Sequence, residues 1–278
     1  MRFGFHTSVA GRVYLAVDRA VERHCETMQI FSSSPRSWQF RALDPADIEE
    51  FKARREEAQI DPLVIHAPYL VNLGSASKNI YIKSIKALEQ GIEHGEMLQA
   101  DHLVFHVGSF KGSTRREGLK NVARAIRILL RLNFKLKLLL ENTSGAGHSL
   151  GSRFEELRFV LDEAKEKGRV GVCLDTAHAF AAGYDLGDKE AVTKTVARFD
   201  RIVGLDKLKL VHANDSKKPC GSHGDRHEHI GKGFIGIEGF RAMVNHPRLK
   251  DLPCILETPG TSVSQDLKNW RAIKSLQD

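Results

Sequence analysis

The chain has 278 residues, 41% of them hydrophobic, which suffices for one large domain or two small ones with a sizeable core. Its formal net charge of +7 suits a polyanionic partner, although many basic proteins bind no nucleic acid. No apolar run is long enough for a signal peptide or a membrane span, and the four cysteines form no CxxC pair, so we expect a cytoplasmic protein with reduced thiols.

Short apolar runs alternate with segments of helical spacing along the whole chain. In chain order, the predicted strands cover residues 2–5, 27–31, 63–66, 103–106, 137–141, 170–175, 208–213 and 253–257. Between them, apolar residues recur every three or four positions, as in amphipathic helices, over 13–21, 85–92, 119–130, 154–161 and 192–199. Eight such strands in a chain of this length predict a (β/α)8 TIM barrel that forms a single domain, residues 1–278.

The longest irregular stretch covers residues 214–233, which are polar and rich in glycine. This composition argues against a helix. Loops of such length in compact domains are usually functional or disordered.

Six of the predicted strands end in a side chain that can bind a divalent cation, and the carboxyl ends of all barrel strands meet at one rim. Zinc, manganese and iron favour imidazole nitrogen and carboxylate oxygen as ligands. Two further candidates lie in the 214–233 loop, and one follows a strand end by three residues. Five histidines and four carboxylates are more than one ion can use, so we expect two or three ions. The nine candidates are His66, His106, Glu141, Asp175, His178, His212, Asp225, His227 and Glu257.

Each candidate alone has a simpler interpretation. A histidine at a strand end is more often a hydrogen-bonded core residue, and Glu141 or Glu257 alone would more commonly pair with a lysine or arginine. Asp175 could cap the following helix, and Asp225 could belong to a solvated loop of mixed charge. Together these interpretations weaken, because several carboxylates at one barrel mouth repel each other unless cations neutralise them.

Three stretches of the chain resemble the endonuclease IV family of apurinic/apyrimidinic DNA repair nucleases. They are ENTSGAG from Glu141, CLDTAHAFAAGYD from Cys173, and HANDSKKPCGSHGDRHEHIGKGFIG from His212. HAPYLVNLGS from His66 and ILETPG from Ile255 agree with the same pattern. The resemblance covers essentially the whole chain and keeps the motifs in order.

The resemblance implies a (β/α)8 barrel that holds three Zn²⁺ ions, with Mn²⁺ an option at one position. It implies cleavage of the phosphodiester 5′ to an abasic site in double-stranded DNA, giving a 3′-hydroxyl and a 5′-deoxyribose phosphate, and removal of blocking groups from 3′ ends. It also implies a monomer with no membrane association, in which Glu141 and Glu257 are the catalytic carboxylates. The implied ligand sets are His66, His106 and Glu141; Glu141, Asp175, His212 and Glu257; and His178, Asp225 and His227.

The resemblance further implies DNA contacts by Arg36, Tyr69 and Leu70. The chain departs from the family pattern at Ala146, where glutamine is usual, and at Ala177, where cysteine is common. Neither position is a ligand, so the departures concern the finer contacts to substrate.

The main alternative is a metal-dependent sugar isomerase or epimerase of a related barrel. Such an enzyme needs one ion and one ligand set of the type Glu141, Asp175, His212 and Glu257. The five remaining candidates are a surplus that an isomerase does not require, and the basic loop after the second predicted strand, with Arg36 and Arg41, argues against a neutral sugar. A second alternative is a DNA-binding or metal-storing barrel without catalytic activity.

Overall fold

The computed structural model describes residues 1–31, 33–165, 168–260 and 262–278, and its centre is a closed barrel of parallel strands. The strand order around the barrel is β1-β10-β7-β6-β5-β4-β3-β2. This confirms the predicted TIM barrel, and every predicted strand agrees with an observed one to within one residue at each end. The strands are β1 (Arg2–His6), β2 (Thr27–Phe31), β3 (Leu63–His66), β4 (His102–His106), β5 (Lys137–Glu141), β6 (Val170–Asp175), β7 (Leu208–His212) and β10 (Pro253–Leu256).

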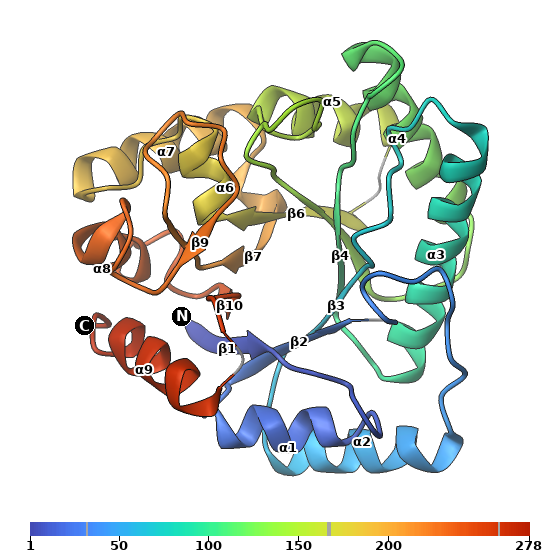
Figure 1. Ribbon diagram of the computed structural model, residues 1–278, viewed down its shortest axis with the longest axis horizontal. Helices are drawn as coiled ribbons and strands as arrows, with labels where there is room; N and C mark the ends of the chain where they lie inside the picture. The colour runs from blue at the N-terminus through green and yellow to red at the C-terminus, as the bar shows by residue number, and fades with distance from the viewer. Residues whose placement is uncertain (32, 166–167, 261) are drawn as a thin grey trace.

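Helices surround the barrel on its outer side (Figure 1). The five helical stripes predicted from the sequence correspond to α1 (Leu15–Glu22), α3 (Lys78–Met97), α4 (Arg115–Leu129), α5 (Phe154–Ala164) and α7 (Lys189–Ile202). Four further helices were not predicted: α2 (Pro45–Glu57), α6 (Thr176–Ala181), α8 (Gly236–Val244) and α9 (Val263–Lys274). Helix α2 has almost no apolar stripe, since Phe51 is its one buried residue, and periodicity therefore did not reveal it. Its start has recognisable helix signals, because Asp44 caps the helix and Pro45 occupies its first turn.

The barrel interior contains an apolar layer directly below the mouth. Six strands contribute one buried side chain each to a separate cluster, formed by Val64, Val104, Leu139, Cys173, Leu210 and Ile255. Side chains on a strand alternate between its two faces, so the residue two positions further along points into the barrel again. Those next inward positions are His66, His106, Glu141, Asp175, His212 and Glu257. The fold therefore places six ligand candidates in one layer above an apolar floor.

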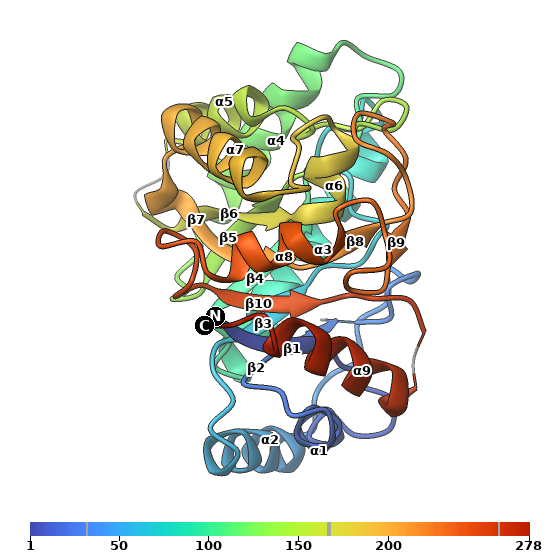
Figure 2. The ribbon, with the colours of Figure 1, turned by 90° about the vertical axis from the view of Figure 1, so that its left-hand side faces the viewer.

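The long connections gather at the carboxyl end of the barrel. In Figure 2 the strands run towards the side that carries the hairpin of β8 (Asp215–Ser216) and β9 (His227–Glu228), and both termini lie towards the other end. This antiparallel hairpin falls within residues 214–233, so the prediction of a wholly irregular loop was wrong for these four residues. The hairpin brings Asp225, in the loop between the two strands, and His227, in β9, back to the barrel mouth. No helix in the described ranges is both long and apolar enough to cross a membrane.

Candidate metal centre

Three groups of metal-ligating side chains lie at the barrel mouth. Within each group, every residue offers one ligand atom, and these atoms lie within 4.8 Å of one another. The first two groups coincide with the first two sets that the sequence resemblance implies, and the third differs in one residue. The groups are His66, His106 and Glu141; Glu141, Asp175, His212 and Glu257; and Asp175, His178 and His227.

Glu141 is common to the first two groups, and its two oxygens face different partners. Oε2 lies 3.2 Å from Nε2 of His66 and 3.1 Å from Nε2 of His106. Oε1 lies 3.2 Å from Nδ1 of His212. The carboxylate is almost completely buried, with 1% of its side chain exposed. One carboxylate that divides its oxygens between two ligand groups has the arrangement needed to bridge two cations.

The third group contains Asp175 where the resemblance implies Asp225. Asp225 is nevertheless close, because its Oδ1 lies 3.3 Å from Nε2 of His178 and 3.7 Å from Nε2 of His227. Oδ2 of Asp175 also lies 3.7 Å from Nε2 of His227. Asp225 is half exposed on the loop, whereas Asp175 is fully buried. An ion held by the two imidazoles has both carboxylates within reach.

The ligand histidines are oriented by hydrogen bonds to their outer ring nitrogens. Nδ1 of His66 donates to the carbonyl oxygen of Ala67 at 2.7 Å, and Nδ1 of His178 donates to that of Asn142 at 2.9 Å. Nδ1 of His227 donates to the carbonyl of Glu257 at 3.1 Å. Because a carbonyl oxygen only accepts, each of these rings carries a proton on Nδ1, so Nε2 is the nitrogen that would bind a cation.

The electrostatics of the protein without cations show that the cluster requires positive charge. Burial raises the pKa of Glu141, but His106 and His212 outweigh this effect and hold the pKa well below the usual range. Burial lowers the pKa of His178, but Asp175, Asp225 and Glu141 together raise the pKa to about 10. Glu141 thus stays ionised and His178 stays protonated in the protein without cations, and a cation bound at His178 would replace its proton.

The donor set fits zinc or a similar ion. Imidazole nitrogen and carboxylate oxygen are its ligands in proteins, and each group offers three or four of them. Nε2 of His227 is buried and has no hydrogen-bond partner. A buried polar atom without a partner is costly, and a cation between the imidazole and the facing carboxylates would remove this cost.

Buried amides support the ligand carboxylates, and the sequence analysis missed them. The side chain of Asn142 accepts from the backbone N–H of Asp175 at 2.7 Å, and Nδ2 of Asn214 donates to Oδ2 of Asp175 at 2.7 Å. Oδ1 of Asn214 also accepts from the backbone N–H of Glu257 at 2.8 Å. Asp175 itself caps α6, because its Oδ1 accepts from the N–H of His178, which confirms the capping interpretation; Asp175 is also a member of two ligand groups. The available signal was the position of each asparagine, one or two residues after a ligand.

The three predicted DNA contacts lie at the rim of the metal centre. Tyr69 is 56% exposed, and its ring lies nearly parallel to that of His106 with 5.9 Å between the centroids. Its backbone N–H donates to the carbonyl of Pro35 at 3.0 Å, which ties this segment to the loop that carries Arg36. Arg36 is exposed and Leu70 is half-buried. Their contact with DNA stays a prediction.

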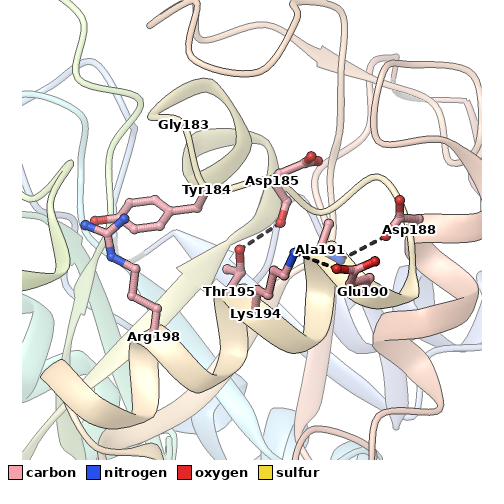
Figure 3. Close-up of a pocket in the computed structure, with 9 residues that line it drawn as sticks. All are labelled: Gly183, Tyr184, Asp185, Asp188, Glu190, Ala191, Lys194, Thr195 and Arg198. Carbon is pink, nitrogen blue, oxygen red and sulfur yellow. Dashed lines mark hydrogen bonds and ion pairs between the residues drawn. The ribbon is translucent and has the colours of Figure 1, made fainter.

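Depressions also lie outside the ligand groups, among them the following two. One of about 850 Å³, bordered by His6 and Phe31, lies between the loops that follow β1 and β2. The other, of about 360 Å³, lies on the outer surface beside α7 (Figure 3), and no candidate ligand lines it. Its charged groups are engaged with neighbours, since Lys194 pairs with Glu190 at 2.6 Å and Arg198 lies over the ring of Tyr184. Within the described ranges, the groups of side chains that could hold a metal ion all lie at the barrel mouth.

Comparisons with known proteins agree with this geometry. The model of the xylose isomerase-like TIM barrel family matches residues 17–276. "Probable endonuclease 4" of Halothermothrix orenii is 42% identical over 263 residues, which cover 94% of this chain and 95% of the relative. The crystal structure of endonuclease IV from Thermus thermophilus superimposes with a TM-score of 0.88 at 39% identity, covering 99% and 98% of the two chains. A D-tagatose 3-epimerase-like protein shares the fold at 21% identity, with a TM-score of 0.75 and coverage of 99% and 97%.

Proposed function

Because the chain belongs to the endonuclease IV family of xylose isomerase-like TIM barrels, we propose that it is a metal-dependent DNA repair nuclease. Its substrate is double-stranded DNA with an abasic site, and it hydrolyses the phosphodiester on the 5′ side of that site. The products are a 3′-hydroxyl and a 5′-deoxyribose phosphate. The same hydrolysis clears blocked 3′ ends.

The proposed cofactor is Zn²⁺, three ions per chain, with Mn²⁺ an option at one position. His66, His106 and Glu141 would hold the first ion, and Glu141, Asp175, His212 and Glu257 the second. His178 and His227 would hold the third with Asp225, and Asp175 lies close enough to take part. Bound divalent cations supply a nucleophile from water at neutral pH and neutralise the phosphate. No serine, cysteine or lysine nucleophile is then required.

The bridging position of Glu141 is the observation that carries this proposal. Its oxygens face His66 and His106 on one side and His212 on the other, at 3.1 to 3.2 Å. A paired metal centre suits phosphodiester hydrolysis, because the attacking and the leaving oxygen both need stabilisation. Glu257 lies beside the same pair, with Oε2 3.4 Å from Nδ1 of His212.

Residues at the rim would bind the DNA. The exposed ring of Tyr69 offers a stacking surface next to the ligands, and Arg36 and Leu70 lie on the neighbouring loops. The net charge of +7 favours association with a polyanion. We infer that the whole chain, residues 1–278, acts as one nuclease domain and as a monomer, since one chain supplies all the ligand candidates. The four free cysteines support a cytoplasmic location.

A sugar epimerase would use the same barrel but fewer ligands. The likeness to the D-tagatose 3-epimerase-like protein, at 21% identity, extends to the fold alone. The group of Glu141, Asp175, His212 and Glu257 would suffice for one ion. His66 and His106 would then have no role, although both face Glu141 within 3.2 Å.

The direct test uses the zinc-loaded protein and a labelled DNA duplex with a single abasic site. We expect one cut on the 5′ side of that site and a product that a DNA polymerase can extend, which reports the 3′-hydroxyl. There are two controls. One is a duplex of the same sequence without the abasic site, and the other is the protein after treatment with a chelator. Neither should give the product. An uncut abasic duplex, combined with epimerisation of a ketose, would reject the nuclease.

A further inference from the structure

Eight inward-facing residues form the layer of the barrel that contains the metal ligands, and two of them are not ligand candidates. These two are His6, at the end of β1, and Gln29, in the middle of β2, and the two are paired in the sheet register. Gln29 is fully buried in this polar layer. A buried amide at such a position needs a partner for each of its polar atoms.

We propose that Gln29 is a positioning residue for the metal position formed by Glu141, Asp175, His212 and Glu257. Its amide determines which ring nitrogen His212 presents to the ion, and it fixes the carboxylate of Glu257. The inference rests on the proposed metal centre and adds to it a residue that contacts no ion.

The contacts of the amide determine which atom is nitrogen and which is oxygen. Nε2 of Gln29 lies 2.7 Å from Oε1 of Glu257, and an ionised carboxylate can only accept, so this amide atom must be the donor. Oε1 of Gln29 then faces Nε2 of His212 at 2.9 Å. Because an amide oxygen only accepts, Nε2 of His212 must carry the proton.

His212 consequently presents Nδ1 to the metal. Nδ1 lies 3.2 Å from Oε1 of Glu141 and 3.4 Å from Oε2 of Glu257, so a cation bound between these carboxylates would replace the proton on Nδ1 and take its lone pair. His66, His178 and His227 have the opposite arrangement, since backbone carbonyls hold their Nδ1 protons. For His212 a side chain performs this task, which makes its orientation accessible to mutation.

Glu257 depends on the same amide because it lies just beyond the end of β10. Its side chain is 19% exposed, against 1% for Glu141, so packing restrains it less. The bond from Gln29 holds one oxygen and leaves Oε2 towards His212. The second N–H of the amide donates to Nδ1 of His6 at 2.9 Å, and the ring of His6 packs against Phe31 with centroids 4.0 Å apart. Both N–H groups and the oxygen of the amide are thereby engaged, which fixes its plane.

The test compares Gln29→Met, which has similar length and no hydrogen bonds, with the wild type. We expect Zn²⁺ to bind about 10–100-fold more weakly at one position, the range found for groups that orient metal ligands. The measurements are zinc equivalents per chain and dissociation constants in competition with a chromogenic chelator. Gln29→Glu keeps an acceptor for His212 but replaces the N–H donor to Glu257 with a like charge, so it should not recover the wild-type affinity. Gln265→Met, on the outer helix α9, should bind as the wild type does.

A merely structural role predicts a different result. The metal-free Gln29→Met protein would then unfold at lower denaturant concentration, while its zinc affinity stayed that of the wild type, and this outcome would overturn the proposal. If Gln29→Met does not fold, long-range ¹H–¹⁵N spectra of the zinc-loaded wild type decide. They should show His212 bound through Nδ1 with a proton on Nε2, and the reverse would overturn the proposal.

Zinc binding is measured without DNA, so this inference and the proposed nuclease can fail separately. A wild-type protein that binds zinc and leaves abasic DNA intact would reject the nuclease alone. A Gln29→Met protein with wild-type zinc affinity would reject the positioning role alone. A wild-type protein that binds no zinc would reject both.

Discussion

Glu141 and His212 approach each other through Oε1 and Nδ1, which lie 3.2 Å apart, while the other oxygen of Glu141 lies 3.1 Å from His106. One carboxylate thus serves two ligand groups. We expect Glu141→Gln to weaken two zinc positions together and to lower kcat/KM on abasic DNA by more than about 100-fold, since even groups behind the ligands cost about 10–100-fold. Zinc equivalents per chain and cleavage rates check this. Loss at a single position would show that Glu141 does not bridge.

Glu257 belongs to one ligand group, so its removal should have a narrower effect. We expect Glu257→Ala to abolish cleavage by weakening the second metal position and to leave the other zinc equivalents in place. The fold should persist, because this carboxylate follows the last barrel strand and contributes no apolar packing to the core. Far-UV circular dichroism and unfolding of the metal-free protein are the controls. Cleavage at the wild-type rate would show that the ligand assignment is wrong.

Tyr69 tests the proposed DNA surface separately from the metals. Its exposed ring lies 6.0 Å from that of His66 and 5.9 Å from that of His106, so a base or sugar stacked on it would lie beside the metal centre. Loss of one stacking contact costs about 1–3 kcal/mol, and we expect Tyr69→Ala to bind abasic duplex about 5- to 150-fold more weakly. Tyr69→Phe keeps the ring and should bind nearly as the wild type. Fluorescence anisotropy gives the affinities, and an unchanged Tyr69→Ala value would remove this residue from the interface.

Asp215 should control the loop that carries Asp225 and His227. It is fully buried, and its carboxylate accepts from the backbone N–H groups of Gly233 at 2.9 Å and Ile235 at 3.0 Å, which closes the loop at its base. Asp215→Ala leaves these donors without an acceptor, each at about 1–3 kcal/mol, so we expect a loss of stability on the order of 3 kcal/mol.

The third zinc position should weaken in the same Asp215→Ala variant, because two of its candidate ligands, Asp225 and His227, lie on the loosened segment after β8. Urea unfolding and zinc equivalents measure the two effects. Asp206→Asn, at a carboxylate that is 76% exposed, is the matched control and should change neither. An Asp215→Ala protein with wild-type stability and all of its zinc would contradict the anchoring role.

The barrel and the ligand layer were predictable because both depend on local periodicity. Apolar runs such as Leu63–His66 mark buried parallel strands, and the two-residue alternation places Val64 and His66 on the same inward face. The carboxyl ends of such strands share one rim, so residues far apart in the chain could be brought together without any knowledge of the packing.

The supporting contacts were not predictable in the same way, because they depend on distances across the barrel. Gln29 lies 228 positions before Glu257, and no local pattern links the two. A polar residue within the buried run Thr27–Phe31 was nevertheless a visible signal. Asp175 belongs to the third group because the segment after β7 turns back and brings His227 near it. A polar, glycine-rich sequence does not determine where that turn occurs.

His102 predicts how the stability of the fold changes with pH. It begins β4 at the end opposite to His106, and its Nδ1 is buried without a hydrogen-bond partner. Burial lowers the pKa of His102 to about 4, and Lys137 on the paired strand contributes to the lowering. Since the folded pKa lies below the ordinary value of 6.5, the unfolded chain binds more protons between these values. Stability is then complete above pH 6.5 and falls as the pH drops towards 4.

The separation from 6.5 to about 4 corresponds to ~3 kcal/mol of unfolding free energy. We expect His102→Gln to reduce the acid-induced loss of stability by up to this amount. Urea unfolding between about pH 4 and 7 measures the difference in unfolding free energy between the two proteins. Excess chelator is present throughout, so that the ligand histidines titrate alike in both. Lys137→Met removes a positive charge that disfavours the imidazolium, so it should raise the folded pKa of His102. The acid-induced loss of unfolding free energy should then be smaller, and it should reach its full extent at a higher pH. Parallel pH profiles for wild type and His102→Gln would mean that the imidazole is solvated in the folded protein, because only a desolvated ring penalises its own protonation.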